Sequence, residues 1–245
     1  MNFEKIRINY NFNKACRTYD KHCAVQNKIC EKTIHLLLTH RNYFDSVGDF
    51  ACGTGESTKQ LVNNIQYKKC YGIDFSENLL NNAKNKLSEV EFLLSDFDNV
   101  VFDDKSLDLV FSNMGLQWSF DLQKTFSVLG HYLKEDGLFV FSLPIDGNFP
   151  EIHPQNKIRT PTHEAISDIL KKLSLKIIKF ENLEYTEKFP DQMTALRSIK
   201  NVGACLVRTT GFKFGLSRSH VKNIFLEENS TTLTYKIGIY IVEKL

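Results

Sequence analysis

The sequence predicts an α/β fold in which a mostly parallel sheet of seven strands carries helices on both faces. Short apolar runs alternate with helical patterns over residues 45–143, as in repeated strand–helix–strand units. Apolar stripes at helical spacing lie between these runs, so helices can cover both faces of a parallel sheet. The runs that predict the first five strands are residues 46–51, 69–73, 90–94, 107–112 and 138–143.

The connecting elements follow from local patterns. A helical stripe over residues 79–87 follows Ser76, which suits an N-cap, and a second stripe over residues 122–133 follows Asp121. Beyond a proline-rich loop, the chain suits a helix at 165–173, a sixth strand at 175–180 and a last strand in TLTYKIGIYIVEKL. We therefore expect a single domain over residues 1–245. Its expected parts are an N-terminal helical lid (1–40, helical over 13–39), a core (45–185), an insertion of two helices (186–230) and a closing strand (231–245).

Composition narrows the class of protein. The chain has 42% hydrophobic and 24% charged residues, as a globular domain does, and its net charge of +2 gives no argument for a nucleic acid partner. There is no apolar run long enough for a membrane span and no apolar signal core in the first 20 residues, so a cytoplasmic location is expected. The cysteines form no C-x-x-C pair, and no metal site is expected. Cys16, Cys23 and Cys30 recur every seven residues, which favours buried small side chains on one helix face over a thiolate site.

The segment DFACGTG, residues 49–55, joins the first predicted strand to a helix, where a cofactor-binding turn is expected. Asp74 ends the next strand 19 residues after Gly55, where a carboxylate can accept hydrogen bonds from ribose hydroxyls; a tight turn with a capping aspartate is the alternative. Glu56 at the helix start would repel a pyrophosphate, and there is no G-x-G-x-x-G motif. The pattern therefore favours S-adenosylmethionine, which has ribose and adenine but no phosphate.

Further candidates follow the third and fourth strands. Asp96 and Phe97 offer an acceptor for an adenine amino group and an adjacent ring, or else form a surface turn. Asn113 ends the fourth strand, where open α/β sheets bind ligands. Gln117 and Trp118 follow at the same rim, so Trp118 forms either a pocket wall or ordinary core.

Several segments resemble a known family. DFACGTG, YGIDFSENLL, LLSDFDNVVFDDKSLDLVFSNMGLQW and LKEDGLFVFSLP resemble successive motifs of class I S-adenosylmethionine-dependent methyltransferases, which have a Rossmann-like sheet. FNKACRTYDKHCAVQ, SNMGLQW, MTALRSIKNVGA and LTYKIGIYIV resemble the malonyl-acyl-carrier-protein O-methyltransferases (BioC) of early biotin synthesis, over residues 12–243. Members of that family methylate the free carboxylate of a malonyl thioester on acyl carrier protein. The alternatives are a methyltransferase for another small acceptor, a non-catalytic assembly protein that binds S-adenosylmethionine, and a nicotinamide dehydrogenase.

The resemblance implies roles for particular residues. Tyr19 would close over the sulfonium, and Ala51 stands where the superfamily usually has glycine; with a negative φ, its methyl would reduce space without abolishing binding. The implied cofactor-binding residues are Asp49, Ala51, Gly53, Gly55, Asp74, Phe75, Asp96, Phe97 and Asn113. The substrate or carrier would meet Gln117, Trp118, Arg197, Lys200 and Arg208, with Tyr19 and Arg197 acting as the catalytic residues.

The chemistry of such a transfer sets two requirements. A malonyl carboxylate is already ionised near pH 7, so no general base is needed. Its charge needs a cation when buried, and arginine gives the better bidentate geometry. Residues 186–225 carry seven Lys and Arg side chains against Glu187 and Asp191, which indicates either a solvated basic helix pair or a docking face for an acidic carrier helix. Arg197 is the predicted partner of the substrate carboxylate.

Overall fold

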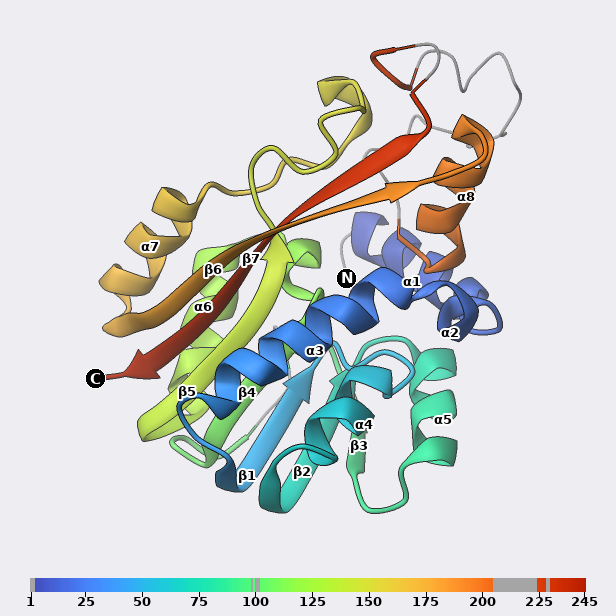
Figure 1. The fold of residues 1–245 in the computed structure, drawn as a ribbon. Helices are drawn as coiled ribbons and strands as arrows, with labels where there is room; N and C mark the ends of the chain where they lie inside the picture. The colour runs from blue at the N-terminus through green and yellow to red at the C-terminus, as the bar shows by residue number, and fades with distance from the viewer. Residues whose placement is uncertain (1–2, 98, 100–101, 205–223, 228–229) are drawn as a thin grey trace.

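The computed structural model describes residues 3–97, 99, 102–204, 224–227 and 230–245, and it contains a seven-stranded sheet (Figure 1). The strand order is β3-β2-β1-β4-β5-β7-β6, with β7 antiparallel to both β5 and β6 and the other pairs parallel. The strands are β1 (Tyr43–Phe50), β2 (Gln66–Asp74), β3 (Glu91–Leu94), β4 (Leu107–Asn113), β5 (Leu133–Pro144), β6 (Leu175–Lys188) and β7 (Thr232–Lys244). The predicted α/β fold with a mostly parallel sheet is confirmed.

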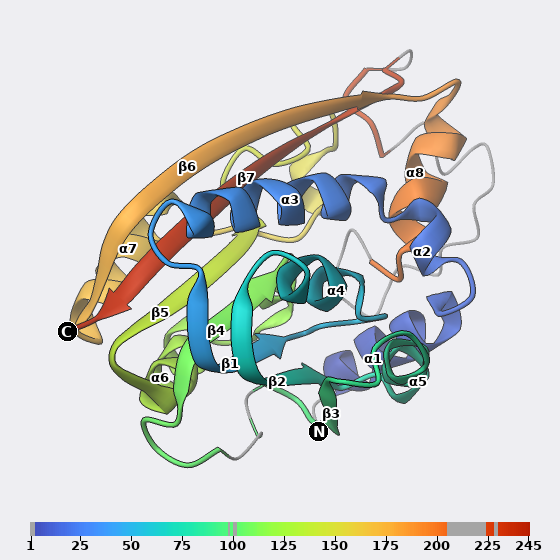
Figure 2. The ribbon, with the colours of Figure 1, turned by 60° about the horizontal axis from the view of Figure 1, so that its bottom comes forward.

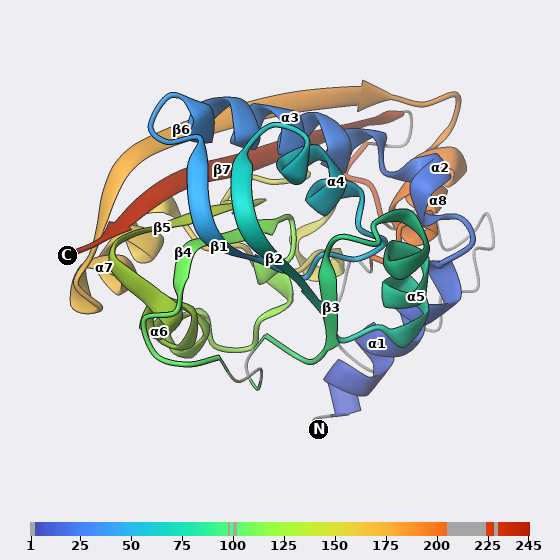
Figure 3. The ribbon, with the colours of Figure 1, turned by 90° about the horizontal axis from the view of Figure 1, so that it is seen from below.

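Helices cover both faces of this sheet. Helices α3 and α4 lie on one face and α6 and α7 on the other, as Figures 2 and 3 show. Alternation along β5 explains the two layers: Leu138 and Val140 join the core under α3, while Phe139 and Phe141 join the core under α6. The helices are α1 (Phe3–Ala15), α2 (Tyr19–His22), α3 (Ala24–Leu38), α4 (Glu56–Val62), α5 (Glu77–Lys86), α6 (Leu122–Tyr132), α7 (His163–Lys172) and α8 (Gln192–Asn201).

The N-terminal segment is mostly helical over 13–39, as expected, but the helical region starts earlier, at Phe3, and is divided into α1, α2 and α3. The chain turns after Ala15, where the Thr18 hydroxyl donates a hydrogen bond to the Ala15 carbonyl. Cys16, Cys23 and Cys30 therefore do not share one helix face, although Cys23 and Cys30 are buried, as the core interpretation predicts. Among the described residues, no group of three or more His, Cys, Asp or Glu could hold a metal ion.

Helix α1 packs beside α5 at the carboxyl ends of β1 and β2 (Figure 3). The Asn9 amide donates to the Phe75 carbonyl at 2.7 Å, and the Asn13 side-chain oxygen accepts from the Asn78 N–H at 3.0 Å and from the Ser76 hydroxyl. Asn13 therefore satisfies a donor that the first turn of α5 leaves unpaired. That residues 1–40 act as a lid stays a prediction.

The late part of the chain also departs from expectation. Strand β6 runs to Lys188, past both the predicted end at 180 and the expected boundary at 185, because it pairs with β7 from Leu175 to Lys188. Helix α8 is the first of the two helices predicted in the insertion. The second helix is predicted around residues 221–225. Residues 205–223 lie outside the described part of the chain, but Ile224 and Phe225 are described and are not helical: Ile224 lies in a turn and Phe225 forms an isolated bridge with Ile152. No helix in the described ranges is long and apolar enough to cross a membrane.

Candidate functional site

Two adjoining cavities open at the carboxyl ends of the parallel strands. The first cavity has ≈ 540 Å³ of empty space, including open solvent at its mouth, and is lined by the segments that follow β1, β2, β3 and β4, and by α1. The second cavity has ≈ 720 Å³ of empty space, also including open solvent, and lies among α3, α8, β7 and the segment after β5. Phe12, Tyr19, Met114 and Trp118 line both cavities. A ligand in one cavity would therefore meet a ligand in the other at these four side chains.

The glycine loop after β1 forms one wall of the first cavity. Gly53 (φ +58°) and Gly55 (φ +79°) both have left-handed backbone conformations, which glycine adopts readily. A Cβ at Gly53 would meet only the Tyr19 hydroxyl, at 4.0 Å, so the backbone there is open to the cavity. A Cβ at Gly55 would lie 2.9 Å from the Cβ of Ala83 in α5. Gly55 therefore allows the loop to pack on α5 and does not line the cavity, which corrects its predicted cofactor contact.

Ala51 lines the first cavity but has a φ of +61°, so the condition of a negative φ, on which its tolerance was predicted, is not met. This left-handed conformation costs an alanine about 1–2 kcal/mol relative to the right-handed one. Its methyl group fits because residue 115 is glycine: a Cβ there would lie 2.5 Å from the Ala51 Cβ. Ala51 and Gly115 are therefore a complementary pair.

The pair can be tested with a double-mutant cycle. Gly115→Ala should lower the free energy of unfolding by about 1–3 kcal/mol, because the new methyl overlaps that of Ala51. In an Ala51→Gly background the same change should cost at least about 1 kcal/mol less, since the overlap is gone. Denaturant unfolding of the four proteins measures this coupling. If the losses in unfolding free energy of the two single variants simply add in the double variant, residues 51 and 115 are not in contact.

Asp74 ends β2, as predicted, and lines the first cavity. Its carboxylate accepts hydrogen bonds from the N–H groups of Gly53 and Ser76, each at 2.8 Å and each on a different oxygen. A carboxylate has about four acceptor sites, so the side chain can still accept a hydrogen bond from a ligand in the cavity. Burial raises the pKa of Asp74 to about 6, even though hydrogen bonds from the N–H groups of Ser76, Gly53 and Phe75 favour the ionised form.

Asp49 was also predicted to bind the cofactor, but it lines neither cavity. It is fully buried, and its Oδ2 accepts hydrogen bonds from the hydroxyls of Ser57 at 3.0 Å and Thr58 at 2.7 Å in the first turns of α4. Its Oδ1 has no hydrogen-bond partner within the described residues. Burial raises the pKa of Asp49 to about 7. Its role is to join β1 to α4 and so to hold the loop between them.

This buried carboxyl predicts a pH dependence of stability. The pKa of Asp49 is about 7 in the folded chain and has the ordinary value of 3.8 in the unfolded chain. Stability that is present at pH 4 is therefore lost as the pH rises to about 7. Asp49→Asn keeps an oxygen for the two hydroxyls and removes the charge. One pKa unit corresponds to about 1.4 kcal/mol. Over this pH range the unfolding free energy of the wild type should therefore fall by up to ~4 kcal/mol more than that of the variant.

Denaturant unfolding between pH 4 and pH 7.5 measures the difference. Asp168→Asn, an exposed aspartate of α7, is the matched control and should keep the wild-type pH profile. A full wild-type decline in Asp49→Asn would refute the buried-charge explanation.

Asp96 and Phe97 line the first cavity at the end of β3, as predicted. Sequence reasoning missed their neighbour Lys5 in α1. Its ammonium pairs with the Asp96 carboxylate and lies 5.6 Å from the centre of the Phe97 ring. Lys5 was missed because α1 begins at Phe3, ten residues before the predicted helix start at 13.

Tyr19 and Trp118 line both cavities, whereas Asn113 lines the first and Gln117 the second. The Asn113 side chain donates to the Gln26 carbonyl of α3 at 3.1 Å and accepts from the Ser142 hydroxyl of β5 at 2.8 Å. Trp118 packs edge-on against Phe12, with ring centres 5.5 Å apart, and serves as a wall of both cavities. Gln117 lines the second cavity, and burial raises the pKa of Tyr19.

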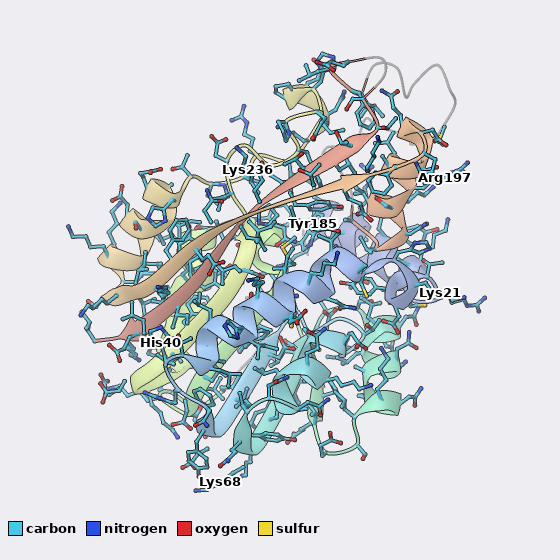
Figure 4. The ribbon with its side chains drawn as sticks, in the orientation of Figure 1. Lys21, His40, Lys68, Tyr185, Arg197 and Lys236 are labelled. Carbon is cyan, nitrogen blue, oxygen red and sulfur yellow. The ribbon has the colours of Figure 1, made fainter. Side chains whose placement is uncertain are left out.

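The predicted substrate cations are placed differently. Arg197 and Lys200 are exposed on α8 and line neither cavity, whereas Ile199 of the same helix faces the second one. Figure 4 shows Arg197 at the outer edge of α8. This placement corrects the prediction that Arg197 contacts the substrate carboxylate. Arg208 lies outside the described residues.

Known proteins match both the sequence and the fold. Residues 48–141 match the family described as a methyltransferase domain. The fold is similar to a putative methyltransferase of Bacillus halodurans (TM-score 0.63, 13% identity, 86% of this chain and 96% of that one). It is also similar to an S-adenosylmethionine-dependent methyltransferase of Clostridium acetobutylicum (TM-score 0.59, 18% identity, 95% and 98%). Fold and site together define a class I S-adenosylmethionine-dependent methyltransferase.

The sequence relatives identify the family within this class. The chain is 41% identical over 250 residues to malonyl-[acyl-carrier protein] O-methyltransferase 2 of Coxiella burnetii, covering 100% of this chain and 98% of that protein. It is 25% identical to malonyl-[acyl-carrier protein] O-methyltransferase of Salmonella typhimurium, covering 95% of each chain. The chain belongs to the malonyl-[acyl-carrier protein] O-methyltransferase family.

The first cavity fits S-adenosylmethionine, the methyl donor of this class. The open backbone at Gly53 leaves room beside the loop, and Asp74 has lone pairs to spare for hydroxyl donors. Phe75, Leu79 and Phe97 supply apolar walls for a flat ring. When bound, this cofactor supplies a methyl group on a positively charged sulfur, which an anionic oxygen can attack.

Proposed function

We propose that this chain transfers the methyl group of S-adenosylmethionine to the free carboxylate of malonyl-acyl carrier protein, an early step of biotin synthesis. The observation that carries the proposal is the wall of Phe12, Tyr19, Met114 and Trp118 that the two cavities share. A donor in the first cavity and an acceptor in the second meet there, with water largely displaced. Alignment of this kind can supply much of the rate of a methyl transfer that needs no general base.

Specific roles follow for the residues of the first cavity. Asp74 would accept hydrogen bonds from the ribose hydroxyls, and Asp96 with Phe97 would hold the adenine. Ala51, Gly53, Phe75 and Asn113 would line the remaining length of the cofactor. Tyr19 and Trp118 would place aromatic faces near the sulfonium, an interaction of about 0.5–2 kcal/mol in a desolvated site.

The carrier protein would dock on the face formed by α2 and α8. These helices touch, and the Thr18 hydroxyl donates to the Asn201 carbonyl at 2.9 Å. Lys21, Arg197 and Lys200 are exposed on this face, and Figure 4 shows Lys21 and Arg197 along the same edge of the molecule. Cations placed here would attract an acidic carrier helix, an attraction that salt screens.

Mass spectrometry of malonyl-acyl carrier protein after incubation with the protein and S-adenosylmethionine tests the function. We expect one added methyl group, and no transfer to either this substrate or malonyl-CoA would refute the proposal. Raising the salt concentration should slow transfer to the carrier substrate more than transfer to malonyl-CoA. Arg197→Glu should do the same, whereas Lys171→Glu, on the exposed part of α7, should not.

A further inference from the structure

The second cavity contains a lysine that sequence reasoning did not single out. Lys157 follows the short 3-10 helix Pro154–Asn156 in the segment between β5 and α7, is half-buried, and lines the second cavity. It is the one charged side chain among the described residues that line this cavity. The other lining residues are apolar or neutral, so Lys157 sets the charge that an occupant meets.

The ammonium group of Lys157 is held in place by the main chain. It donates hydrogen bonds to the carbonyl of Asn148 at 2.9 Å and to that of Phe149 at 3.0 Å, and both of these residues also line the cavity. The carbonyls are themselves fixed on β7, since the Phe149 N–H donates to the Thr234 carbonyl and the Lys236 N–H donates to the Asn148 side chain. Lys157 is therefore positioned before any substrate arrives.

The hydrogen bonds of Lys157 leave one donor and a net charge unmatched. An ammonium group has three N–H donors, of which the two carbonyls use two. Within the described ranges, the charges of Asp146 and Glu151 act on it, but neither carboxylate forms an ion pair with it; Glu151 instead accepts from the backbone and hydroxyl of Thr234. A cation that is partly desolvated and hydrogen-bonded only to neutral carbonyls favours binding of an anion. In agreement, burial lowers the pKa of Lys157, and this effect exceeds that of the two carboxylates, which raise the pKa.

We propose that Lys157 binds the free carboxylate of the methyl acceptor and so makes the enzyme specific for acyl thioesters that carry one. This inference rests on the proposed function. One carboxylate oxygen accepts from Lys157 while the other faces the shared wall. That second oxygen forms a bond to the methyl carbon as the methyl–sulfur bond breaks, its electron pair staying on sulfur, and no proton moves. The ester product carries no charge there, so it loses the ion pair and leaves more easily.

The test compares wild type with Lys157→Met, which keeps most of the length of the side chain without its charge, and Lys157→Arg, which keeps the charge. Binding of malonyl- and acetyl-carrier protein is measured in each, together with methyl transfer to the malonyl substrate. Wild type should bind the malonyl form about tenfold to hundredfold more tightly than the acetyl form, the size of a charge-assisted hydrogen bond. Lys157→Met should lose most of this ratio and Lys157→Arg should keep most of it.

Two controls separate the possible failures. Binding of S-adenosylhomocysteine should be equal in all three proteins, which shows that the variants fold and that the first cavity is intact. If wild type transfers methyl groups and Lys157→Met keeps the full malonyl preference, the role of Lys157 is refuted and the proposed function stands. If wild type transfers none, the proposed function fails, and a malonyl preference that depends on Lys157 still supports the binding role.

Discussion

Asp74→Ala is expected to weaken the binding of S-adenosylhomocysteine by about tenfold to hundredfold. The change removes a charged acceptor, and hydrogen bonds to charged groups contribute about 1.5–3 kcal/mol. It also removes the partner of the Gly53 N–H, so the loop that lines the first cavity loses an anchor. Titration calorimetry at pH 8 measures the affinity, and circular dichroism checks that the variant is folded.

The same carboxyl predicts a pH dependence of cofactor binding. The pKa of Asp74 is about 6 in the unliganded chain, so lowering the pH through 6 protonates it and weakens it as an acceptor. Wild-type affinity should therefore fall below pH 6, and Asp74→Asn should show a low affinity that varies less over this range. Asp168→Ala, on the exposed part of α7, should bind as wild type does. Unchanged affinity in Asp74→Ala would remove Asp74 from the cofactor site.

Replacing glycine by alanine at positions 53 and 55 of the loop after β1 is expected to have different effects. Gly55→Ala should lower the free energy of unfolding by about 2–4 kcal/mol, because it adds the left-handed cost of about 1–2 kcal/mol to overpacking against α5. The new Cβ would lie 2.9 Å from the Ala83 Cβ and 3.1 Å from its backbone Cα, neither of which can rotate away.

Gly53→Ala should lower the free energy of unfolding only by the cost of placing an alanine in the left-handed backbone conformation. Its Cβ would meet nothing nearer than the Tyr19 hydroxyl, at 4.0 Å. Its methyl group points into the first cavity, so S-adenosylhomocysteine binding should weaken at least about tenfold. Denaturant unfolding and calorimetry on both variants separate the two effects. If Gly53→Ala binds as wild type does, the loop does not contact the cofactor.

Much of the fold could be predicted from local pattern. The seven strands lie near their predicted positions because apolar runs of strand length alternate with helical stripes. Asp74, Asp96 and Asn113 line the first cavity as predicted, because the carboxyl ends of parallel strands meet at one edge of the sheet. The cofactor class followed from the same loop, since Glu56 stands at the helix start where a pyrophosphate would bind.

Two features of the site were missed, for different reasons. The placement of Arg197 could have been read from local helical spacing, because Leu196 and Ile199 on the same helix are buried and Arg197 is not. Lys157 lies in a segment without periodicity, so no local pattern separates it from other surface lysines.

The sequence by itself determined the class of fold, the edge of the sheet at which the first cavity opens, and the family. The first two depend on short-range order, namely strand length, helix spacing and a loop between a strand and a helix, whereas the family followed from the resemblance of whole motifs. Only the tertiary structure decided which cation lines the second cavity and why Ala51 is tolerated. Lys157 faces the second cavity because β7 holds Asn148 and Phe149 in place from the far end of the chain. Ala51 fits because Gly115, 64 residues later, has no side chain to meet its methyl group.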